Sequence, residues 1–312
     1  MTTGIGGIAG APDLAAAPTT PETGPSAAAR RSRNARYGRW LILLVAAIYF
    51  LGPLVAAIAF TLKGDNGGIS FAAYGDIFTT SNGQTGLGGA LLYSLLIAAV
   101  SIVITLALML PTQLLVHLRL PAWRPLVETL TLLPLVFPPI VLVVGVSDVY
   151  AWAAPPTNAA AGTQESFVFH ILKFLREDSH PLLLALLYVI LAMPFTFRAL
   201  DSGIRAIDAQ TLVEAARNLG AGWSTVLFRV LMPCLRTALV NAAFLCFALV
   251  MGEFTISSVL LYTKPFPVWL AQLPTTSGQV QAAVSVFSLL LVEVILLVLG
   301  ALNVRGPAGR KE

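Results

Sequence analysis

Two glutamates stand inside long apolar stretches of the sequence, where a charge has chemical consequences. Glu253 follows Met251 and Gly252, and Glu293 lies at the centre of a second stretch. A carboxylate at the centre of a membrane helix costs about 2.5 to 3.5 kcal/mol to insert, so both should face the bundle interior or a wet cavity rather than lipid. Gly252, Glu253 and Glu293 are therefore predicted to line a translocation pathway. For Glu253 the alternative is a helix–helix hydrogen bond, and for Glu293 a protonated structural carboxyl serves equally well.

The remaining candidates for chemistry point to no catalytic residue, metal site or cofactor in this chain. It has no Gly-x4-Gly-Lys-Ser/Thr phosphate loop, so it is not expected to hydrolyse ATP, and it lacks His-Glu-x-x-His and Gly-x-Ser-x-Gly. His117, His170 and His180 are scattered through connecting segments and are expected to be solvated rather than ligating. Cys234 and Cys246 fall in one expected helix, about 18 Å apart at the helical rise, which is too far for a disulfide.

The composition is that of an all-α integral membrane protein. Of the 312 residues, 57% are hydrophobic and only 11% are charged, against about 25% charged in soluble domains. Apolar runs recur at the length of about 20 residues that crosses a hydrocarbon core as helix. The net charge of +4 sits in short connections without stacking aromatics on a soluble face, which argues against nucleic acid as a partner.

Six membrane spans are expected in a helical bundle embedded in the lipid bilayer. They cover residues 40–62, 88–110 (with a continuation past Pro111 left open), 126–150, 181–200, 235–262 and 280–304. Several prolines fall inside them: Pro53, Pro134, Pro138, Pro139 and Pro194. Membrane helices tolerate such kinks or breaks when their neighbours satisfy the freed carbonyls.

The basic residues orient these spans. With a cytoplasmic N-terminus, all of the 19 Lys and Arg except Lys63, Lys173, Arg176 and Lys264 fall on the inner side. This is a strong positive-inside signal. Both termini are therefore expected in the cytoplasm. The chain divides into a disordered tail at 1–38 that ends in an arginine cluster, a transmembrane domain at 39–304 and a C-terminal tail at 305–312.

A polar segment between the fourth and fifth spans forms an expected helix–glycine–helix elbow, residues 211–233. Thr211 and Glu214 have the spacing of a capping box, with Asp208 as a rival N-cap. Leu212, Ala215, Ala216 and Leu219 share one helical face, and Glu214, Arg217 and Asn218 face the other way. Gly220 is expected to end the helix in a left-handed conformation. A second short helix starts near Ser224 and stops or kinks at Pro233.

The elbow resembles the signature loop of the permease subunits of binding-protein-dependent, type I ABC importers. The spacing of that loop falls on seven residues: Glu214, Ala215, Ala216, Gly220, Val230, Met232 and Pro233. Val230 and Met232 replace the usual isoleucine and leucine. The family's five-helix core would correspond to residues 88–304, with the first span as the common additional helix, in a MetI-like fold.

The resemblance implies a coupling helix that docks into a separate ATPase subunit and transmits its closure through the loop 214–233 to the membrane helices. Small and apolar residues would fill the ATPase groove, and Glu214 or Arg217 would fix the register. ATP and magnesium would bind the ATPase subunits. A second permease chain or a copy of this one, and an extracytoplasmic solute-binding protein, would complete the complex in a bacterial plasma membrane. The outer loop 151–180 could meet the binding protein.

The cargo and two rival functions stay open at this stage. Gly252-Glu253-Phe254 and Lys264-Pro265-Phe266-Pro267 look similar to the polyamine, phosphonate and iron branch of the family. Acids in the pathway would favour a cation such as spermidine or putrescine, although a partner subunit could reverse the local sign. One alternative is an ion- or proton-coupled carrier or channel that titrates Glu253 and Glu293, but no internal repeat supports it. The other, an intramembrane enzyme, lacks its nucleophile and metal constellations.

Overall fold

The computed structural model describes residues 27–64, 68–81, 83, 85–154, 167–177, 181–273 and 278–304. Within these ranges the chain is helical, with no β-strand and two isolated bridges, Lys63 with Ile69 and Ser81 with Gly86. The all-α prediction is confirmed. By its internal contacts the chain divides into residues 1–55 and 56–312.

Helix α1 (Ala27–Thr61) begins earlier than the sequence suggested. Its apolar part, Arg39–Thr61, is long and apolar enough to cross a bilayer and includes Pro53. The helix also takes in the arginine cluster that was expected in a disordered tail, because alanine and arginine are strong helix formers that extend the span toward the N-terminus. Residues 1–26 and 305–312, the rest of the two expected tails, lie outside the described residues.

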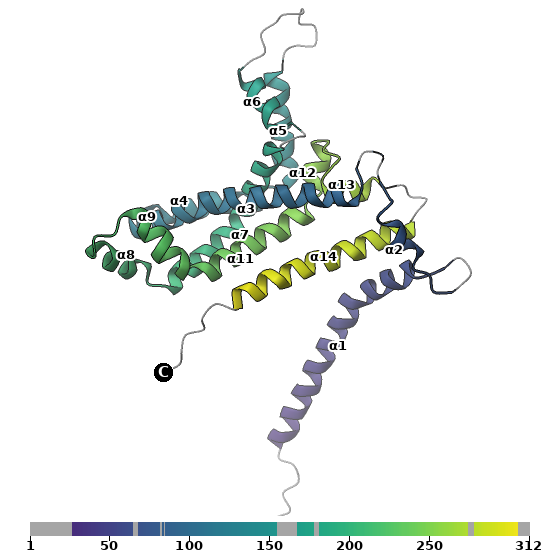
Figure 1. Cartoon of the computed structure of the whole chain (residues 1–312). Coiled ribbons are helices and arrows are strands. Elements are labelled where there is room, and N and C mark those ends of the chain that lie inside the picture. The colour runs from purple at the N-terminus through teal and green to yellow at the C-terminus, as the bar shows by residue number, and fades with distance from the viewer. Residues whose placement is uncertain are drawn as a thin grey trace, which may run out of the picture. The chain divides into compact units, whose positions relative to one another are not determined.

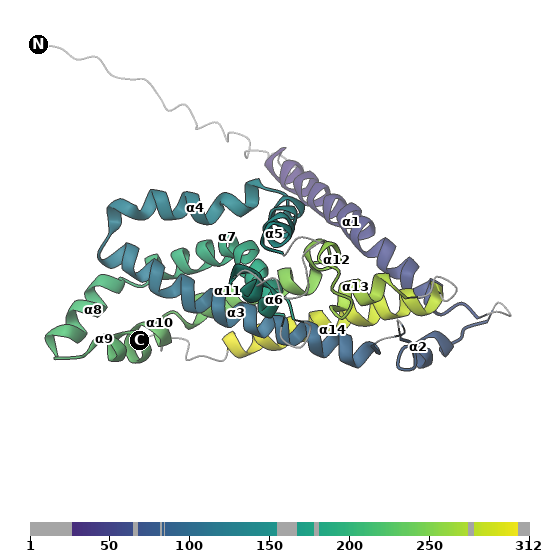
Figure 2. The same cartoon turned by 90° about the horizontal axis from the view of Figure 1, so that it is seen from above.

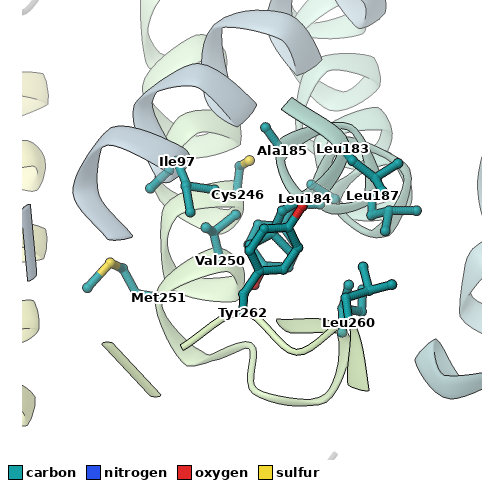
Figure 3. Close-up of a cluster of buried hydrophobic side chains, with 14 of the residues drawn as sticks. Ile97, Leu183, Leu184, Ala185, Leu187, Cys246, Val250, Met251, Leu260 and Tyr262 are labelled. Carbon is teal, nitrogen blue, oxygen red and sulfur yellow. The ribbon is translucent and has the colours of Figure 1, made fainter. Parts of the chain in front are cut away.

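Three helices form the centre of residues 56–312 (Figures 1 and 2). They are α3 (Leu87–Leu118), α7 (Leu182–Ala206) and α11 (Arg236–Gly252), each packed on the other two. Figure 3 shows one buried cluster between them, in which Ile97, Leu184 and Val250 come from the three helices. Helix α3 continues through Pro111, so the second span runs past its expected end.

Helix α14 (Gly278–Val304) packs against α11 and against two short helices, α2 (Ala72–Asp76) and α13 (Phe266–Ala271). A separate buried cluster, which includes Ile77 and Trp269, joins these elements to the start of α3. The Trp269 indole donates a hydrogen bond to the Thr85 carbonyl at 2.6 Å. The α2–α13 side therefore forms a second, smaller core at the end of the bundle away from α8.

The third expected span is broken rather than continuous. Helix α4 (Arg124–Val136) follows a single 3-10 turn, Pro121–Trp123, and packs against α7. Phe137 and Pro138 are extended, and α5 (Pro139–Ala153) leaves at 93° to the first part of the pair. The proline pair causes this break, because Pro138 and Pro139 supply no amide to the preceding turn. Helix α6 (Phe167–Leu175) packs beside α5, and both rise away from α3 and α4 in Figure 1.

The described residues contain four unbroken helices that could cross a membrane and two bent pairs that could each count as one span. The unbroken ones are α1, α3, α7 and α14. The second bent pair joins the segment Trp223–Cys234 to α11 at 77°. A multi-pass helical bundle with up to six spans is therefore confirmed, whereas the fifth expected span is shorter than predicted, because α11 ends at Gly252 instead of continuing to Tyr262.

Helices α7 and α11 come close together at Gly203 and Ala238. A Cβ atom added to Gly203 would overlap the Ala238 Cβ, so the two backbones can meet only because position 203 carries no side chain. Such close contacts between small residues are a main source of helix association in membranes.

We expect Gly203→Val to separate these helices and to lower the free energy of unfolding by about 1 to 3 kcal/mol, the usual range for overpacking. Gly145→Val in α5 is the matched control, since a Cβ there meets no atom within 4 Å. Thermal unfolding in detergent measures the stability of both variants. Equal stability of the two variants would contradict the close contact.

Candidate functional site

Helix α8 (Ala209–Asn218) is capped by Asp208 and not by Thr211. The Asp208 carboxylate accepts a long hydrogen bond from the Thr211 amide (3.4 Å) and a short one from the Thr211 hydroxyl (2.6 Å). The Glu214 carboxylate accepts a hydrogen bond from the Gln210 side-chain amide at 2.9 Å instead of one from the Thr211 backbone amide. The predicted capping box is therefore wrong and the rival N-cap is correct, because the helix starts early enough to place Thr211 in its first turn.

The faces of α8 also differ from the prediction. Ala209 and Val213 are buried, and Leu212 and Ala216 are packed partly against the same cluster. Of the four residues predicted to share the contact face, two therefore pack on the protein and two do not. Ala215 and Leu219 are exposed, as are Thr211, Glu214 and Asn218. The reason is that the helix packs on its own bundle through one half of its apolar face. Only the other half is free for a partner.

Gly220 ends α8 as predicted. Its φ is +82°, its amide donates to the Arg217 carbonyl at 2.9 Å, and the Ala221 amide donates to the Ala216 carbonyl at 3.0 Å. These two bonds define a Schellman motif, which needs a residue that accepts positive φ. Leu219 is left at the tip of the turn, 89% exposed.

The second arm of the elbow is not a plain α-helix. A single α-turn, α9 (Trp223–Thr225), leads into a π-helix, Val226–Leu231, and then into α10 (Met232–Cys234). Pro233 has no amide to hold the usual register, and the Met232 amide bonds to the Leu227 carbonyl five residues back. The bend predicted at Pro233 is found just beyond it, at Leu235. No pattern in the sequence indicated the wider turn itself.

Both arms rest on one buried cluster at this end of the bundle, called the elbow end below. Val213, Val226 and Leu231 of the elbow pack with Leu114 of α3 and Ile204 of α7. Val230 and Met232, two of the signature positions, are half-buried, and Pro233 is exposed. The elbow is therefore seated on the membrane helices through side chains from both arms.

Arg217 of the first arm contacts the start of the second arm. Its guanidinium lies 5.4 Å from the centre of the Trp223 ring and donates to the Ala221 carbonyl at 3.3 Å. Arg119, at the end of α3, lies over the same ring at 5.2 Å. Of the two charges expected to fix a partner's register, Glu214 is therefore the freer one, because Arg217 is already engaged within the elbow.

A charged cluster beside the elbow was missed in the sequence. Asp201 of α7 accepts from Arg124 at 2.8 and 2.9 Å and from Arg205 at 3.0 Å, and its Oδ1 lies 3.2 Å from the His117 Nε2. The expectation that His117 is solvated is wrong, since its other ring nitrogen lies 3.0 Å from the Gln113 carbonyl. Only the Asp201–Arg205 pair, four residues apart on one helix, could have been anticipated. The remaining contacts depend on how α3, α4 and α7 pack.

Glu253 sits where α11 ends, and its carboxylate is turned toward the protein backbone. The side chain is buried, with the residue 8% exposed, and its two oxygens lie 2.9 and 3.1 Å from the Ile256 amide. The Tyr188 hydroxyl is also hydrogen-bonded to it. Glu253 therefore caps the short helix α12 (Thr255–Val259), and this local bond competes with continuation of α11.

The three residues predicted to line a pathway are not brought together in this chain. Glu253 is buried, whereas Gly252 is exposed and Glu293 lies on an exposed face of α14. The packed face of α14 includes Val292 and Ile295 instead. The expectation that Glu293 faces the interior of this bundle is wrong for the chain by itself, because its position on the helix falls outside the packed stripe. A pathway role of these residues stays a prediction.

Glu253→Gln and Glu253→Ala separate a transport role from a capping role. Glutamine keeps an acceptor for the Ile256 amide and removes the charge, whereas alanine removes both. If the charge acts in transport, Glu253→Gln should lower uptake at unchanged thermal stability. If the residue only caps α12, the glutamine variant should match the parent, and the alanine variant should lose about 1 kcal/mol of stability. Uptake and thermal unfolding measured on both variants decide between the two.

Comparison with known proteins places this fold and elbow in a family. Residues 118–306 match the family described as "Binding-protein-dependent transport system inner membrane component". The chain belongs to this family, and it is a membrane-spanning permease subunit of a type I ABC importer rather than an enzyme. The match covers α4 to α14, which includes the elbow.

Two relatives carry a more specific description. The molybdenum transport system permease proteins ModB of Mycobacterium bovis and Mycobacterium tuberculosis are each 29% identical to this chain over 283 residues. The alignment covers 87% of this chain and 96% of each relative. These similarities do not support the polyamine branch suggested by the sequence.

Proposed function

We propose that the elbow is the surface through which a separate ATPase subunit drives this permease. The observation that carries the proposal is the exposed half of α8, where Thr211, Glu214, Ala215 and Leu219 face away from the bundle while the other half is fixed to it. A partner can thus bind one side of a helix whose other side packs on the second arm of the elbow, in the buried cluster that also includes residues of α3 and α7. ATP and magnesium would bind that partner and not this chain.

The elbow is joined to the membrane helices at both of its ends. Helix α8 follows directly on α7, and the second arm leads into α11 through the 77° bend at Leu235. Helices α7 and α11 in turn touch at Gly203 and Ala238. A displacement of the elbow would therefore act on both central helices and alternate the pathway between its outward-facing and inward-facing forms.

The full transporter would contain a second permease chain, or a second copy of this one, with two ATPase subunits and an extracytoplasmic binding protein. Large apolar side chains stay exposed on several helices of residues 56–312, such as Val103 of α3, Leu130 of α4 and Leu297 of α14. Lipid and a second permease would cover them. We infer that the elbow end and both termini lie in the cytoplasm of a bacterial cell, and the distribution of Lys and Arg supports this orientation.

The proposed cargo is an oxyanion of molybdenum. Support comes from the two relatives, which align along nearly their whole length and are described as molybdenum transport permeases. The physical case for a cationic cargo rested on acids in the pathway, and the geometry weakens that case. Glu253 points its oxygens at the Ile256 amide, so it presents no free carboxylate to a passing solute.

Glu214→Lys and Gly220→Pro should uncouple ATP hydrolysis from uptake. Lysine reverses the charge of position 214 on the exposed face of α8. Proline cannot adopt the positive φ of position 220 and lacks the amide that bonds to Arg217. We expect uptake to fall about tenfold or more, equivalent to ~1.4 kcal/mol of lost coupling, while the protein still inserts.

Gly222→Ala is the matched control for the glycine, because position 222 has φ −72° and space for a Cβ. Uptake by whole cells and ATP hydrolysis by the purified complex are the two measurements. Parental uptake in both elbow variants, with the ATPase still essential, would count heavily against the coupling role.

The cargo can be tested in cells that lack this chain. Uptake of radioactive molybdate at low concentration should fall in these cells and return when the chain is restored, and excess tungstate should compete with it. Excess spermidine should not compete, because its charge is opposite. Parental molybdate uptake in the deletion strain, or competition by spermidine alone, would reject the molybdenum assignment while leaving the coupling role intact.

A further inference from the structure

An apolar pocket of about 570 Å³ lies between the last turns of α3 and the second arm of the elbow. One wall is a helical stripe of α3, which consists of Pro111, Leu114, Leu115 and Leu118. The other wall is formed by Leu227, Phe228 and Leu231. Its size falls within the range of about 300 to 1,000 Å³ that is usual for sites that hold small organic molecules.

A second, polar pocket of about 410 Å³ adjoins the first. The two pockets share Leu118, Arg119 and Trp223, and the polar one continues along α8 past Gln210, Glu214, Arg217 and Asn218. The pair therefore forms one bipartite cavity, apolar along the membrane helix and polar beside the elbow, with Trp223 between the two parts.

The charge at the junction is positive. Arg119 and Arg217 both lie over the Trp223 ring, and Glu214 is the single carboxylate, already bonded to Gln210. No described residue accepts a hydrogen bond from the Arg119 side chain. Its guanidinium donors are therefore available to an anion at the point where the apolar part ends.

The apolar part is bordered on one side by the last turns of the candidate membrane span Leu87–Leu118, and two of its lining residues, Leu115 and Phe228, are 51% and 63% exposed. Acyl chains surround such side chains in a bilayer, and basic pockets between membrane helices on the cytoplasmic side bind anionic lipid head groups. A small soluble anion would leave the apolar part unfilled, and a lipid without net negative charge would leave the positive charge of Arg119 and Arg217 unbalanced.

We propose that this cavity binds a phospholipid with an anionic head group from the leaflet at the elbow end. One acyl chain lies between Leu115 and Phe228, and the phosphate meets Arg119 beside Trp223. The lipid bridges α3 and the second arm of the elbow. The polar part of the cavity borders Glu214 and Asn218 of the outward face of α8, whereas the contacts proposed for the lipid, with Leu115, Arg119 and Phe228, lie outside that face.

The test counts lipids retained by the full chain, purified with the subunits that accompany it, in native mass spectrometry. The protein is prepared in nanodiscs with equal amounts of phosphatidylglycerol and phosphatidylcholine. The parent should retain phosphatidylglycerol in preference. Arg119→Gln should lower that retention about fivefold, since one cation near an anionic lipid surface contributes ~1 kcal/mol.

Arg229→Gln is the matched control. Arg229 is an exposed arginine of the π-helix that forms one wall of the apolar part, but it lines neither pocket. Ser224→Phe provides a second variant. Its phenyl ring should fill the apolar part of the cavity without changing Arg119, and it should therefore lower the number of lipids retained. Equal retention of the two lipids by the parent would overturn the proposal. So would equal losses in Arg119→Gln and Arg229→Gln, or a cross-linker at position 228 that captures a protein subunit instead of lipid.

Discussion

The constraint on which the structure depends is that a helix inside a bilayer can break only where its freed backbone groups find other partners. Three helix ends in the chain satisfy their backbone groups in different ways. Helix α11 stops at Gly252, and the carboxylate of the next residue, Glu253, takes the Ile256 amide. At Gly220 the Schellman bonds close α8. At Pro138 the break needs fewer partners, because two consecutive prolines carry no amide hydrogens.

The same requirement explains the form of the elbow. Its first arm is capped at both ends, by the Asp208 side chain at the N-terminus and by the turn at Gly220 at the C-terminus. Its second arm widens into a π-helix before Pro233, a rare conformation that, where it occurs, is frequently found at functional sites. One arm is thus regular and the other irregular, and both share the same buried cluster with α3 and α7.

Much of the architecture could be predicted from the sequence, because span length and the Gly220 turn depend on neighbouring residues alone. The choice between Asp208 and Thr211 as N-cap was also local, but two acceptable residues competed and the helix start decided between them. The contacts of Asp201 with Arg124 and His117 could not be predicted, since they join residues far apart in sequence. The exposed position of Glu293 on α14 could not be predicted, because composition gives depth in the membrane but not the packed face of a helix.

The contact between Gly203 and Ala238 has a mechanical consequence for the loop that separates them in sequence. The chain leaves α7 just after Gly203, traverses the elbow and re-enters the bundle at α11 just before Ala238, so the excursion is clamped at its base. Because the two stems are packed together at the base of this hairpin, a force applied at its tip would act on α7 and α11 at once instead of on either helix alone.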